Sequence, residues 1–459
     1  MIAVTTFAKK SVLVFGLGGS GLATALSLKH GGAEVLAFDD NEERVQAANA
    51  QGIETADFRT LDFSPHDALI LSPGVPLTHP EPHWSVTKAQ AAGVEIIGDV
   101  ELFNRERLVI APECTFIAIT GTNGKSTTTA LIAHILSSAG RDVQMGGNIG
   151  RAVLTLDAFA KDKAYVVECS SYQIDLAPTL KPSIGIHINL SADHLDRHGT
   201  VEHYADVKAR LVLGAEHAIV GVDDDFSRMM ADKVEAKGVP LERVSLLKSA
   251  DISAKGGAIF SNGERVVDVA GVASVRGEHN LQNAAIAYAT CRKAGLSDRE
   301  IQAGFASFPG LAHRMEPVAS KDGVFFINDS KATNADAAAY ALASFDKVYW
   351  ILGGLAKDGG IESLERLFPK VIHAFLVGEA EDDFAKALEG KVEYSKCETI
   401  ENATAQAAQM ALSNALVDEG GTNQTTAVLL SPACASWDQF PSFEKRGDAY
   451  KNAVHLALK

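Results

Sequence analysis

The chain has 459 residues, and its 42 Lys and Arg against 58 Asp and Glu give a formal net charge of −16. This length exceeds one typical domain, so we expect two or three domains. The acidic balance argues against a nucleic-acid-binding protein, which would need a basic face. It is compatible with small anionic ligands, because helix N-termini bind phosphate even within acidic proteins.

The cysteines and the apolar runs indicate the cellular compartment of the protein. Five cysteines, an odd number without a Cys-x-x-Cys pair, favour reduced thiols over a disulfide framework or a zinc site. The apolar run 12–28 contains glycines and leads into a strand pattern, so we interpret it as part of a folded βα unit rather than a signal peptide. No apolar stretch is long enough to span a bilayer. We expect a cytoplasmic protein without membrane insertion.

The first hundred residues alternate strand and helix patterns, which predicts a parallel sheet with right-handed crossovers. Strands are expected at 11–15, 34–38, 68–71 and 95–97. The turn after the first strand reads Gly-Leu-Gly-Gly-Ser-Gly over 16–21, and Asp39-Asp40 ends the second strand. This matches the dinucleotide-binding fingerprint, although another nucleotide diphosphate or a purely structural turn would fit the same glycines.

The segment 117–129 is the most informative stretch of the chain. An apolar β-branched run leads into Gly-Thr-Asn-Gly-Lys-Ser, and a helical pattern follows. Backbone N–H groups at such a helix start favour a polyphosphate, Lys125 would reach its β/γ-phosphates, and the Ser126 hydroxyl suits Mg²⁺. The full P-loop pattern is not met, because Ile119 stands where its first glycine would be. We expect ATP binding here rather than an ordinary loop.

The rest of the chain continues the α/β theme. We expect central strands at 164–168, 183–189 and 218–222, short β patterns near 258–260 and 264–269, and helices over 201–215 and around Asn280 and Asn283. The turn 308–310 is a plausible boundary. Beyond it, strands are expected at 324–328, 347–352, 374–377 and 427–430, each followed by a polar or Gly-rich loop. Three α/β domains in series are predicted.

Several residues beside these strand ends suit the chemistry of phosphate and carboxylate groups. Glu168 and His194 follow central strands and would complete magnesium sites, although His194 also fits a hydrogen-bonding loop residue and Lys208 a solvated surface charge. In the third region, cations and hydroxyls around 329–331, Lys357 and Ser436 would suit a small dicarboxylate; helix capping is the alternative. Arg314 would place a guanidinium near a transferred phosphate.

Together these motifs carry a family resemblance. Thr-Gly-Thr-Asn-Gly-Lys-Ser-Thr over 120–127 resembles the ATP-binding motif of the Mur ligases, an amide-forming family that includes folylpolyglutamate synthetase. Glu168 with Ser170-Ser171, Asn189 with the run 193–196, Gly277–Asn280 with Asn283, and His313-Arg314 match in the same order. The resemblance spans the whole chain. It implies an α/β fold of three domains: a Rossmann-like UDP-sugar domain at 1–103, a P-loop-ATPase-like ATP/Mg domain with a parallel or mixed sheet at 104–310, and a Rossmann-like amino-acid domain at 311–459.

The resemblance also implies a reaction. The first-domain glycines and the runs 329–334 and 431–436 are similar to those of members that join D-glutamate to UDP-N-acetylmuramoyl-L-alanine in peptidoglycan precursor synthesis. ATP would phosphorylate the carboxylate, and the D-glutamate amine would attack the acyl phosphate through a tetrahedral intermediate. The Asp-Asn-Pro-Arg signature expected of the diaminopimelate- or lysine-adding members is not found in the sequence. The implied cofactors are ATP, two Mg²⁺ ions and a CO₂-derived carbamate on Lys208. We expect a monomer.

Site residues follow from the resemblance, position by position. The implied catalytic residues are Lys125, His194 and Lys208, and the implied metal ligands are Ser126, Glu168, His194 and Lys208. ATP contacts are implied for Gly121, Thr122, Asn123, Gly124, Lys125, Ser126, Thr127, Asn280, Asn283, Arg314 and Asp329. The UDP-sugar contacts implied are Gly19, Ser20, Ser72, Gly74, Asn148, Ser170 and Gln173, and the D-glutamate contacts are Thr333, Lys357, Ser436 and Phe443.

The match departs from the family at three places, and other functions compete with it. Asp40-Asn41 lacks the hydroxyl-plus-Arg pair of some members, and Trp437 and Leu355-Ala356 look variable. One alternative is a family ligase for another amino acid. A second is an NAD-dependent dehydrogenase built on the 16–21 fingerprint, which leaves the Lys125 loop without a purpose. A third is a non-enzymatic nucleotide-binding module, against which Glu168, His194 and Lys208 argue together.

Overall fold

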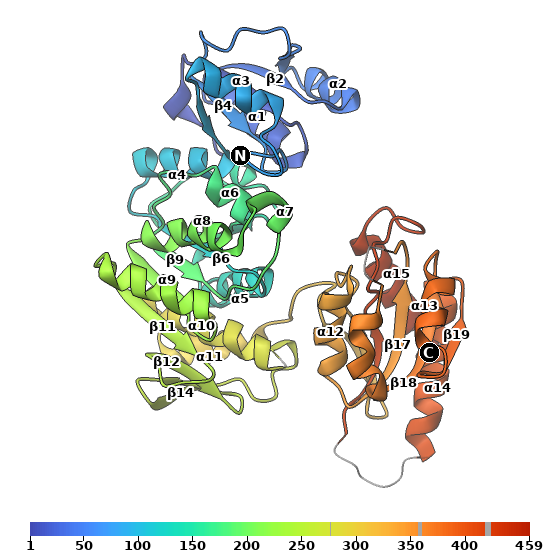
Figure 1. Cartoon of the computed structure of the whole chain (residues 1–459). Helices are drawn as coiled ribbons and strands as arrows, with labels where there is room; N and C mark the ends of the chain where they lie inside the picture. Colours follow the sequence, from blue (N-terminus) through green and yellow to red (C-terminus); the bar gives the residue numbers. More distant parts are fainter. Residues whose placement is uncertain (276, 357–359, 418–423) are drawn as a thin grey trace. The chain divides into compact units, whose positions relative to one another are not determined.

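The computed structural model describes residues 1–275, 277–356, 360–417 and 424–459, and these form two compact units (Figure 1). The first unit comprises Met1–Gly271 with Glu278–Phe308, and the second comprises Val272–Gly277 with Pro309–Lys459. The first unit contains two sheets and the second contains one. The predicted boundary after residue 103 falls within a helix, α4 (Asp99–Ile110), and the boundaries of the three domains stay predictions.

The N-terminal sheet is five-stranded and parallel throughout, in the order β3-β2-β1-β4-β5. The four strands predicted for this region are present with the predicted bounds, and the short β3 is additional. Its elements are η1 (Thr5–Phe7), β1 (Ser11–Phe15), α1 (Gly19–His30), β2 (Glu34–Phe38), α2 (Glu42–Ala50), β3 (Glu54–Thr55), β4 (Ala68–Leu71), α3 (Trp84–Ala92), β5 (Glu95–Ile97) and α4.

The central sheet has nine strands in the order β14-β13-β12-β11-β10-β9-β6-β8-β7, parallel from β7 to β12 and antiparallel at its β12-β13-β14 end. Its elements are β6 (Thr115–Thr120), α5 (Lys125–Ser138), β7 (Asp142–Gly147), η2 (Val153–Thr155), β8 (Lys163–Glu168), α6 (Ser171–Asp175), β9 (Ile184–His187), α7 (Leu195–His198), α8 (Val201–Leu213), β10 (His217–Gly221), α9 (Asp225–Ala236), β11 (Leu241–Ser245), β12 (Ile252–Lys255), β13 (Ala258–Ser261), β14 (Glu264–Asp268), α10 (Glu278–Lys293) and α11 (Asp298–Ser307). β7, β11 and β12 escaped prediction because they carry few apolar residues.

The sheet of the second unit has the order β15-β16-β20-β17-β18-β19, and only β15 runs antiparallel to its neighbour. All four strands predicted here are present. Its elements are η3 (Ala273–Val275), β15 (Glu316–Lys321), β16 (Val324–Asn328), α12 (Ala335–Ala343), β17 (Lys347–Gly353), η4 (Glu362–Lys370), β18 (Val371–Val377), α13 (Glu381–Leu388), β19 (Tyr394–Lys396), α14 (Ile400–Val417), β20 (Thr426–Leu430) and α15 (Phe443–Ala457). The mixed α/β class with three sheets confirms the predicted fold class.

The core of the central sheet explains why its strands end in functional loops. β6 lies between β9 and β8, and its residues Ile117, Ala118 and Ile119 are fully buried, as expected of a parallel strand with both faces covered. Ile119 pairs with Glu168 on β8, and Thr120 with His187 on β9. The three strands therefore end at the same edge of the sheet, and the loops that follow them meet there.

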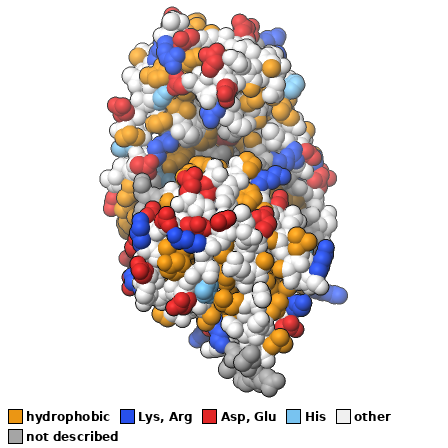
Figure 2. Space-filling model, turned by 90° about the vertical axis from the view of Figure 1, so that its right-hand side faces the viewer, with side chains coloured by type: hydrophobic (Ala, Val, Ile, Leu, Met, Phe, Trp, Pro, Cys, Tyr) orange, Lys and Arg blue, Asp and Glu red, His pale blue; other side chains and the backbone are white. Residues whose placement is uncertain are grey.

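The surface carries charges of both signs. On the face drawn in Figure 2, acidic and basic side chains are intermingled with apolar ones. Ion pairs link the two signs, for example between Arg105 and Glu95, whose atoms approach to 2.6 Å. Among the helices of the described residues, none combines the length and the apolar character that crossing a membrane requires.

Candidate active site

The phosphate-binding loop connects β6 to α5. Gly124 immediately precedes α5 with a φ of +83°, a conformation that favours glycine, and a Cβ at this position would lie 2.3 Å from Oδ1 of Asn283. The N-cap residue of α5 is Gly124, which has no side chain to occupy the start of the helix, and helix N-termini favour anionic ligands. Asn283 on α10, a predicted ATP contact, therefore lies against the loop, with Asn280 Oδ1 accepting from its Nδ2 at 3.1 Å.

The segment after β9 fixes the other side of this loop. The backbone N–H of Thr122 donates to the carbonyl of Asn189 at 2.9 Å, and that of Asn123 donates to the Asn189 side-chain oxygen, also at 2.9 Å. The Thr122 hydroxyl donates to the carbonyl of Ser191 at 3.2 Å. These hydrogen bonds hold the loop and the segment after β9 together.

Two lysines converge on the loop. Lys125 donates through Nζ to the carbonyls of Gly121 and Thr122 at 2.9 and 2.7 Å, and Lys208 donates to the Thr120 hydroxyl and the Gly121 carbonyl at 3.1 and 2.9 Å. Lys208 is 1% exposed on α8, so its interpretation as a solvated surface charge is wrong. Burial, and next the charge of Lys125, hold the pKa of Lys208 well below its usual range.

Glu168 ends β8 in a buried position with one carboxylate oxygen unused. Its Oε1 accepts from Asn148 Nδ2 at 2.8 Å, whereas Oε2 is buried and has no hydrogen-bond partner among the described residues. A buried carboxylate oxygen without a partner is rare, and hard cations such as Mg²⁺ prefer this kind of ligand. Ser126, the other residue predicted to give this magnesium ion an oxygen ligand, is buried in the first turn of α5. This donor set fits Mg²⁺.

His194 lies at the N-terminus of α7 in a left-handed conformation, with a φ of +53°. Its ring is half exposed, and Nε2 lies 3.4 Å from Asp193 Oδ2. The ring of Tyr204 lies 6.5 Å from that of His194, and Lys208 Nζ is 4.7 Å from the Tyr204 ring centre. The Tyr204 ring therefore lies near both His194 and Lys208, which are predicted as ligands of one ion.

The residues predicted to bind the UDP-sugar come from both sheets of the first unit. Arg197 on α7 donates to the carbonyls of Pro73, Gly74 and Val75, so the loop that carries Ser72 and Gly74 is tied to the segment that carries His194. Gly19 and Ser20 begin α1 in the N-terminal sheet domain.

Ser170, Gln173 and Asn148 lie at the strand ends of the central sheet. Ser170 and Gln173 form a capping box at the start of α6, and Gln173 Nε2 also donates to Asp99 Oδ1 at 3.5 Å. Asn148 contacts Glu168 twice, because its backbone N–H also donates to the Glu168 carbonyl at 2.9 Å. The predicted sugar contacts on this sheet therefore adjoin the predicted metal ligand.

The tip of β2 shows what sequence reasoning missed. Asp39 Oδ2 accepts from the backbone N–H of Leu17 at 2.6 Å, so this carboxylate closes the glycine-rich turn. Asp40 instead pairs with Arg59 at 2.6 Å and His83 at 3.2 Å. The guanidinium of Arg59 lies 5.2 Å from the Phe38 ring centre. Sequence reasoning did not predict that Arg59, 19 residues further along the chain, pairs with Asp40 at this strand tip.

The loops of the second unit gather at the ends of β16, β17 and β20, which are neighbours in its sheet. Asp329 is 7% exposed; its carboxylate accepts from the Ser431 hydroxyl at 2.9 Å and the Met315 N–H at 3.1 Å. Burial raises the pKa of Asp329 to about 7. Ser436 is buried, and Lys331 Nζ lies 3.8 Å from the ring centre of Phe443.

Three further residues of this unit are predicted to contact ligands. Thr333 lies just before α12, Arg314 follows the buried His313, and Lys357 lies outside the described residues.

A buried arginine that the sequence did not reveal holds these loops together. Arg446 on α15 is 2% exposed and makes five hydrogen bonds. They reach the hydroxyl and carbonyl of Ser330 and the carbonyls of Gly353, Cys434 and Ala435. The loops after all three central strands are therefore anchored on one guanidinium.

Comparison with known proteins identifies the family. Family models match three successive segments: the Mur ligase MurD-like N-terminal domain over residues 10–98, the Mur ligase middle domain over 119–291, and the Mur ligase glutamate ligase domain over 313–434. A protein of Agrobacterium fabrum strain C58, named UDP-N-acetylmuramoylalanine--D-glutamate ligase, is 57% identical over 456 residues, which cover 98% of this chain and 96% of that protein. This chain belongs to the Mur ligase family.

Other relatives of this Mur ligase agree. The protein of the same name from Rhizobium meliloti strain 1021 is 57% identical over 460 residues, covering 99% of this chain and 98% of that protein. Solved structures show the same fold at low identity. UDP-N-acetylmuramate-alanine ligase from Thermotoga maritima has a TM-score of 0.60 at 16% identity over 98% of this chain and 100% of its own. MurF from Acinetobacter baumannii has a TM-score of 0.58 at 19% identity, covering 96% and 93%. The family expected from the sequence is confirmed.

Proposed function

We propose that this Mur ligase joins D-glutamate to UDP-N-acetylmuramoyl-L-alanine, with ATP hydrolysed to ADP and phosphate, in cytoplasmic peptidoglycan precursor synthesis. The relatives that are 57% identical over nearly their whole length carry that substrate pair in their name. The observation in the structure that supports it best is the convergence of Lys125, Lys208 and the loop 121–124, beside a buried carboxylate with an unused oxygen.

ATP activates a carboxylate that would otherwise resist attack by an amine. The N–H groups at the start of α5 and Lys125 hold the polyphosphate, because both present positive charge to it. Transfer of the γ-phosphoryl to the L-alanine carboxylate forms an acyl phosphate, and the D-glutamate amine attacks its carbonyl carbon. The tetrahedral intermediate then expels phosphate. Asn280, Asn283, Arg314 and Asp329 belong to this proposal as further ATP contacts, together with Gly121, Thr122, Asn123 and Thr127.

Magnesium binding is assigned to oxygen-bearing groups at this edge of the central sheet. Ser126 and Glu168 would hold one ion, and the unused Oε2 of Glu168 is the atom that fits best. His194 and Lys208 would hold a second. When bound, the ions supply positive charge that offsets repulsion between the anionic carboxylate and the polyphosphate.

We also propose that Lys208 reacts with CO₂. An amine must be neutral to attack, and the buried position that lowers the pKa of Lys208 favours the neutral form. The nitrogen of the neutral amine would bond to the carbon of CO₂ and lose one proton, which converts the amine into an anionic oxygen ligand. Protein equilibrated with ¹³C-bicarbonate should give one carbamate signal by ¹³C NMR that Lys208→Met lacks. An unchanged signal in that variant would contradict the assignment.

The amino-acid site is proposed in the second unit. Thr333, Lys357, Ser436 and Phe443 would contact D-glutamate, with Lys357 pairing one of its carboxylates. The UDP-sugar would contact Gly19, Ser20, Ser72, Gly74, Asn148, Ser170 and Gln173. We propose further that the enzyme acts as a monomer, which light scattering coupled to size exclusion would test.

The deciding experiment measures ATP-dependent phosphate release with UDP-N-acetylmuramoyl-L-alanine, Mg²⁺ and a panel of amino acids that includes both glutamate enantiomers. We expect release with D-glutamate alone, together with a new amide product. Release with a different amino acid would keep the family and overturn the proposed substrate. A folded protein that releases no phosphate with any of them would overturn the proposed activity.

A further inference from the structure

We propose that Asp175, His198 and His203 bind a divalent transition-metal cation of the zinc type, at a site distinct from the magnesium ligands of the proposed reaction. Within the part of the chain that the structure describes, this group brings one carboxylate oxygen and two ring nitrogens within 4.8 Å of one another. The three residues come from three successive helices: Asp175 ends α6, His198 ends α7, and His203 lies in the first turn of α8.

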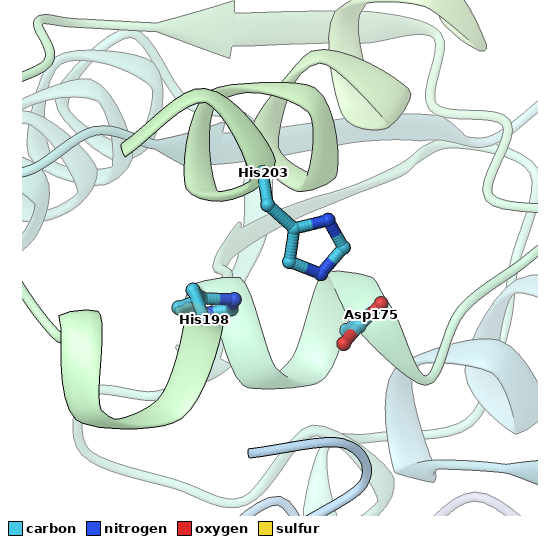
Figure 3. Close-up of side chains that lie close together, drawn as sticks. All are labelled: Asp175, His198 and His203. Carbon is cyan, nitrogen blue, oxygen red and sulfur yellow. The ribbon is translucent and has the colours of Figure 1, made fainter. Parts of the chain in front are cut away.

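The geometry needs only small adjustment to hold an ion. Figure 3 shows the His203 ring hanging from α8 with a nitrogen turned toward the space between His198 and Asp175. Ligand atoms around tetrahedral Zn²⁺ lie about 2.0–2.2 Å from the metal, and so roughly 3.4 Å from one another. Closing the separations, which are at most 4.8 Å, to that value requires a shift of up to about 1.4 Å. His203 is half-buried at the start of its helix and is placed to make it.

His198 provides the second, independent observation. Its side chain is 2% exposed; Nε2 lies 2.8 Å from the Ser171 hydroxyl, and Nδ1 is buried without a hydrogen-bond partner among the described residues. A buried ring nitrogen with no partner calls for an explanation, such as an ion. Burial, and next the neighbouring His203, lower the pKa of His198 to about 4, so its imidazole is neutral near pH 7, the form that binds metals.

The ligand types select the class of ion. Two imidazoles and a carboxylate suit Zn²⁺ and neighbouring transition metals, whereas Mg²⁺ prefers oxygen ligands alone. Arg210 Nη1 lies 3.0 Å from Asp175 Oδ1 and competes for this carboxylate. A carboxylate has acceptor sites on both oxygens, however, so it accepts the guanidinium and an ion together and is oriented by the former.

Two tyrosine rings contact both this cluster and the proposed magnesium ligand His194. The ring of Tyr172 lies 5.3 Å from that of His194 and 5.5 Å from that of His198, and the ring of Tyr204 lies 6.5 and 5.1 Å from the same two. A cation on the cluster would link α6, α7 and α8. It would therefore fix the four-residue helix that begins next to His194 and carries Arg197 onto the 73–75 loop.

The test is Zn²⁺ titration of the metal-stripped full chain by calorimetry, in excess Mg²⁺, with Co²⁺ as a spectroscopic probe. We expect one equivalent bound by the parent protein and by His455→Ala, an exposed histidine of the second unit. His203→Ala and the isosteric Asp175→Asn should each weaken that site at least about tenfold and remove the Co²⁺ absorption bands. Glu168→Gln should leave it intact, because the magnesium ligands lie elsewhere.

Three results would overturn the proposal. They are the absence of stoichiometric binding by the parent, equal affinity of the parent and both cluster variants, and loss of the site in Glu168→Gln. Circular dichroism and melting curves establish that each variant is folded. If His203→Ala disturbs α8, Asp175→Asn still tests the site, because it keeps the side-chain shape.

Discussion

Lys125 and Lys208 donate to the same atom, the carbonyl oxygen of Gly121, each at 2.9 Å. Burial, and next the charge of Lys125, hold the pKa of Lys208 well below its usual range, so the neutral amine is favoured there. Lys125 is half-buried and is the ammonium group that the loop presents to a polyphosphate.

Replacing Lys125 should therefore weaken nucleotide binding without unfolding the protein. Lys125→Met keeps the side-chain length and removes the charge, so we expect a loss of about 2–3 kcal/mol in ATP affinity, from one charge-assisted contact. Calorimetric titration with a non-hydrolysable ATP analogue measures it. Lys233→Met, which removes the surface ion pair with Asp206, is the control and should bind as the parent does.

Gly124→Ala should abolish tight nucleotide binding through a clash as well as through strain. A Cβ at Gly124 would lie 2.3 Å from Asn283 Oδ1, so the Asn283 side chain or the loop must shift. Gly140 is the matched control, because its φ of +81° is nearly the same and a Cβ there meets no atom within 4 Å. Both alanine variants should lose about 1–2 kcal/mol of stability. Only Gly124→Ala should lose ATP affinity; similar affinities in the two would refute the role given to Asn283.

Glu168→Gln should separate metal binding from folding. The Mg²⁺ concentration for half-maximal activity should rise at least about tenfold, because a neutral amide is a weaker ligand than a carboxylate. The melting temperature without metal should not fall, because Oε2 has no partner to lose and a buried amide costs less than a buried charge. Glu242→Gln, at a partly exposed carboxylate 3.6 Å from His217 Nε2, should change neither quantity. A large drop in melting temperature would instead make Glu168 a structural residue.

Asp99→Asn should stabilise the protein in a pH-dependent way. Burial raises the pKa of Asp99 from 3.8 to about 6, so the folded state holds the proton more tightly than the unfolded state does. Parent stability therefore falls, relative to the variant, as the pH rises from about 4 to 6, and the full difference of about 3 kcal/mol persists above that range. Melting temperatures of both proteins between pH 4 and 8 test this. A difference that does not change with pH would contradict it.

Arg446→Met should loosen the loops that carry the proposed D-glutamate contacts. Losing five hydrogen bonds leaves several buried carbonyls without donors, which we expect to cost about 3 kcal/mol or more in stability. Ser436 is one residue from Ala435, one of the anchored carbonyls, so KM for D-glutamate should rise more than KM for ATP. Arg446→Lys restores the charge but not the planar fork and should recover only part of either loss. Equal changes in the KM for D-glutamate and the KM for ATP would show that Arg446 does not position the D-glutamate contacts.

The sequence determined the class of the fold and the identity of the loop. Buried strands with near-continuous apolar runs, such as 117–119, are visible in sequence because both faces of a parallel strand are covered. Gly-Lys-Ser at the start of a helix is likewise visible in sequence, because the glycine conformation, the helix N–H groups and the lysine charge that bind phosphate all come from a few neighbouring residues. β7, β11 and β12 were not predicted, because their polar residues interrupt the apolar pattern from which strands are predicted.

Tertiary structure decided everything that depends on partners distant in the chain. From its neighbours in sequence Lys208 looks like a surface charge; only the packing of α8 against β6 and β9 buries it and brings it to the Gly121 carbonyl. Arg59 reaches Asp40, and Arg446 reaches three loops, across separations that no local pattern encodes. Local motifs specify which chemical groups are present. The pKa values of these groups and the ligands they bind depend on burial and on nearby charges, which are properties of the folded chain alone.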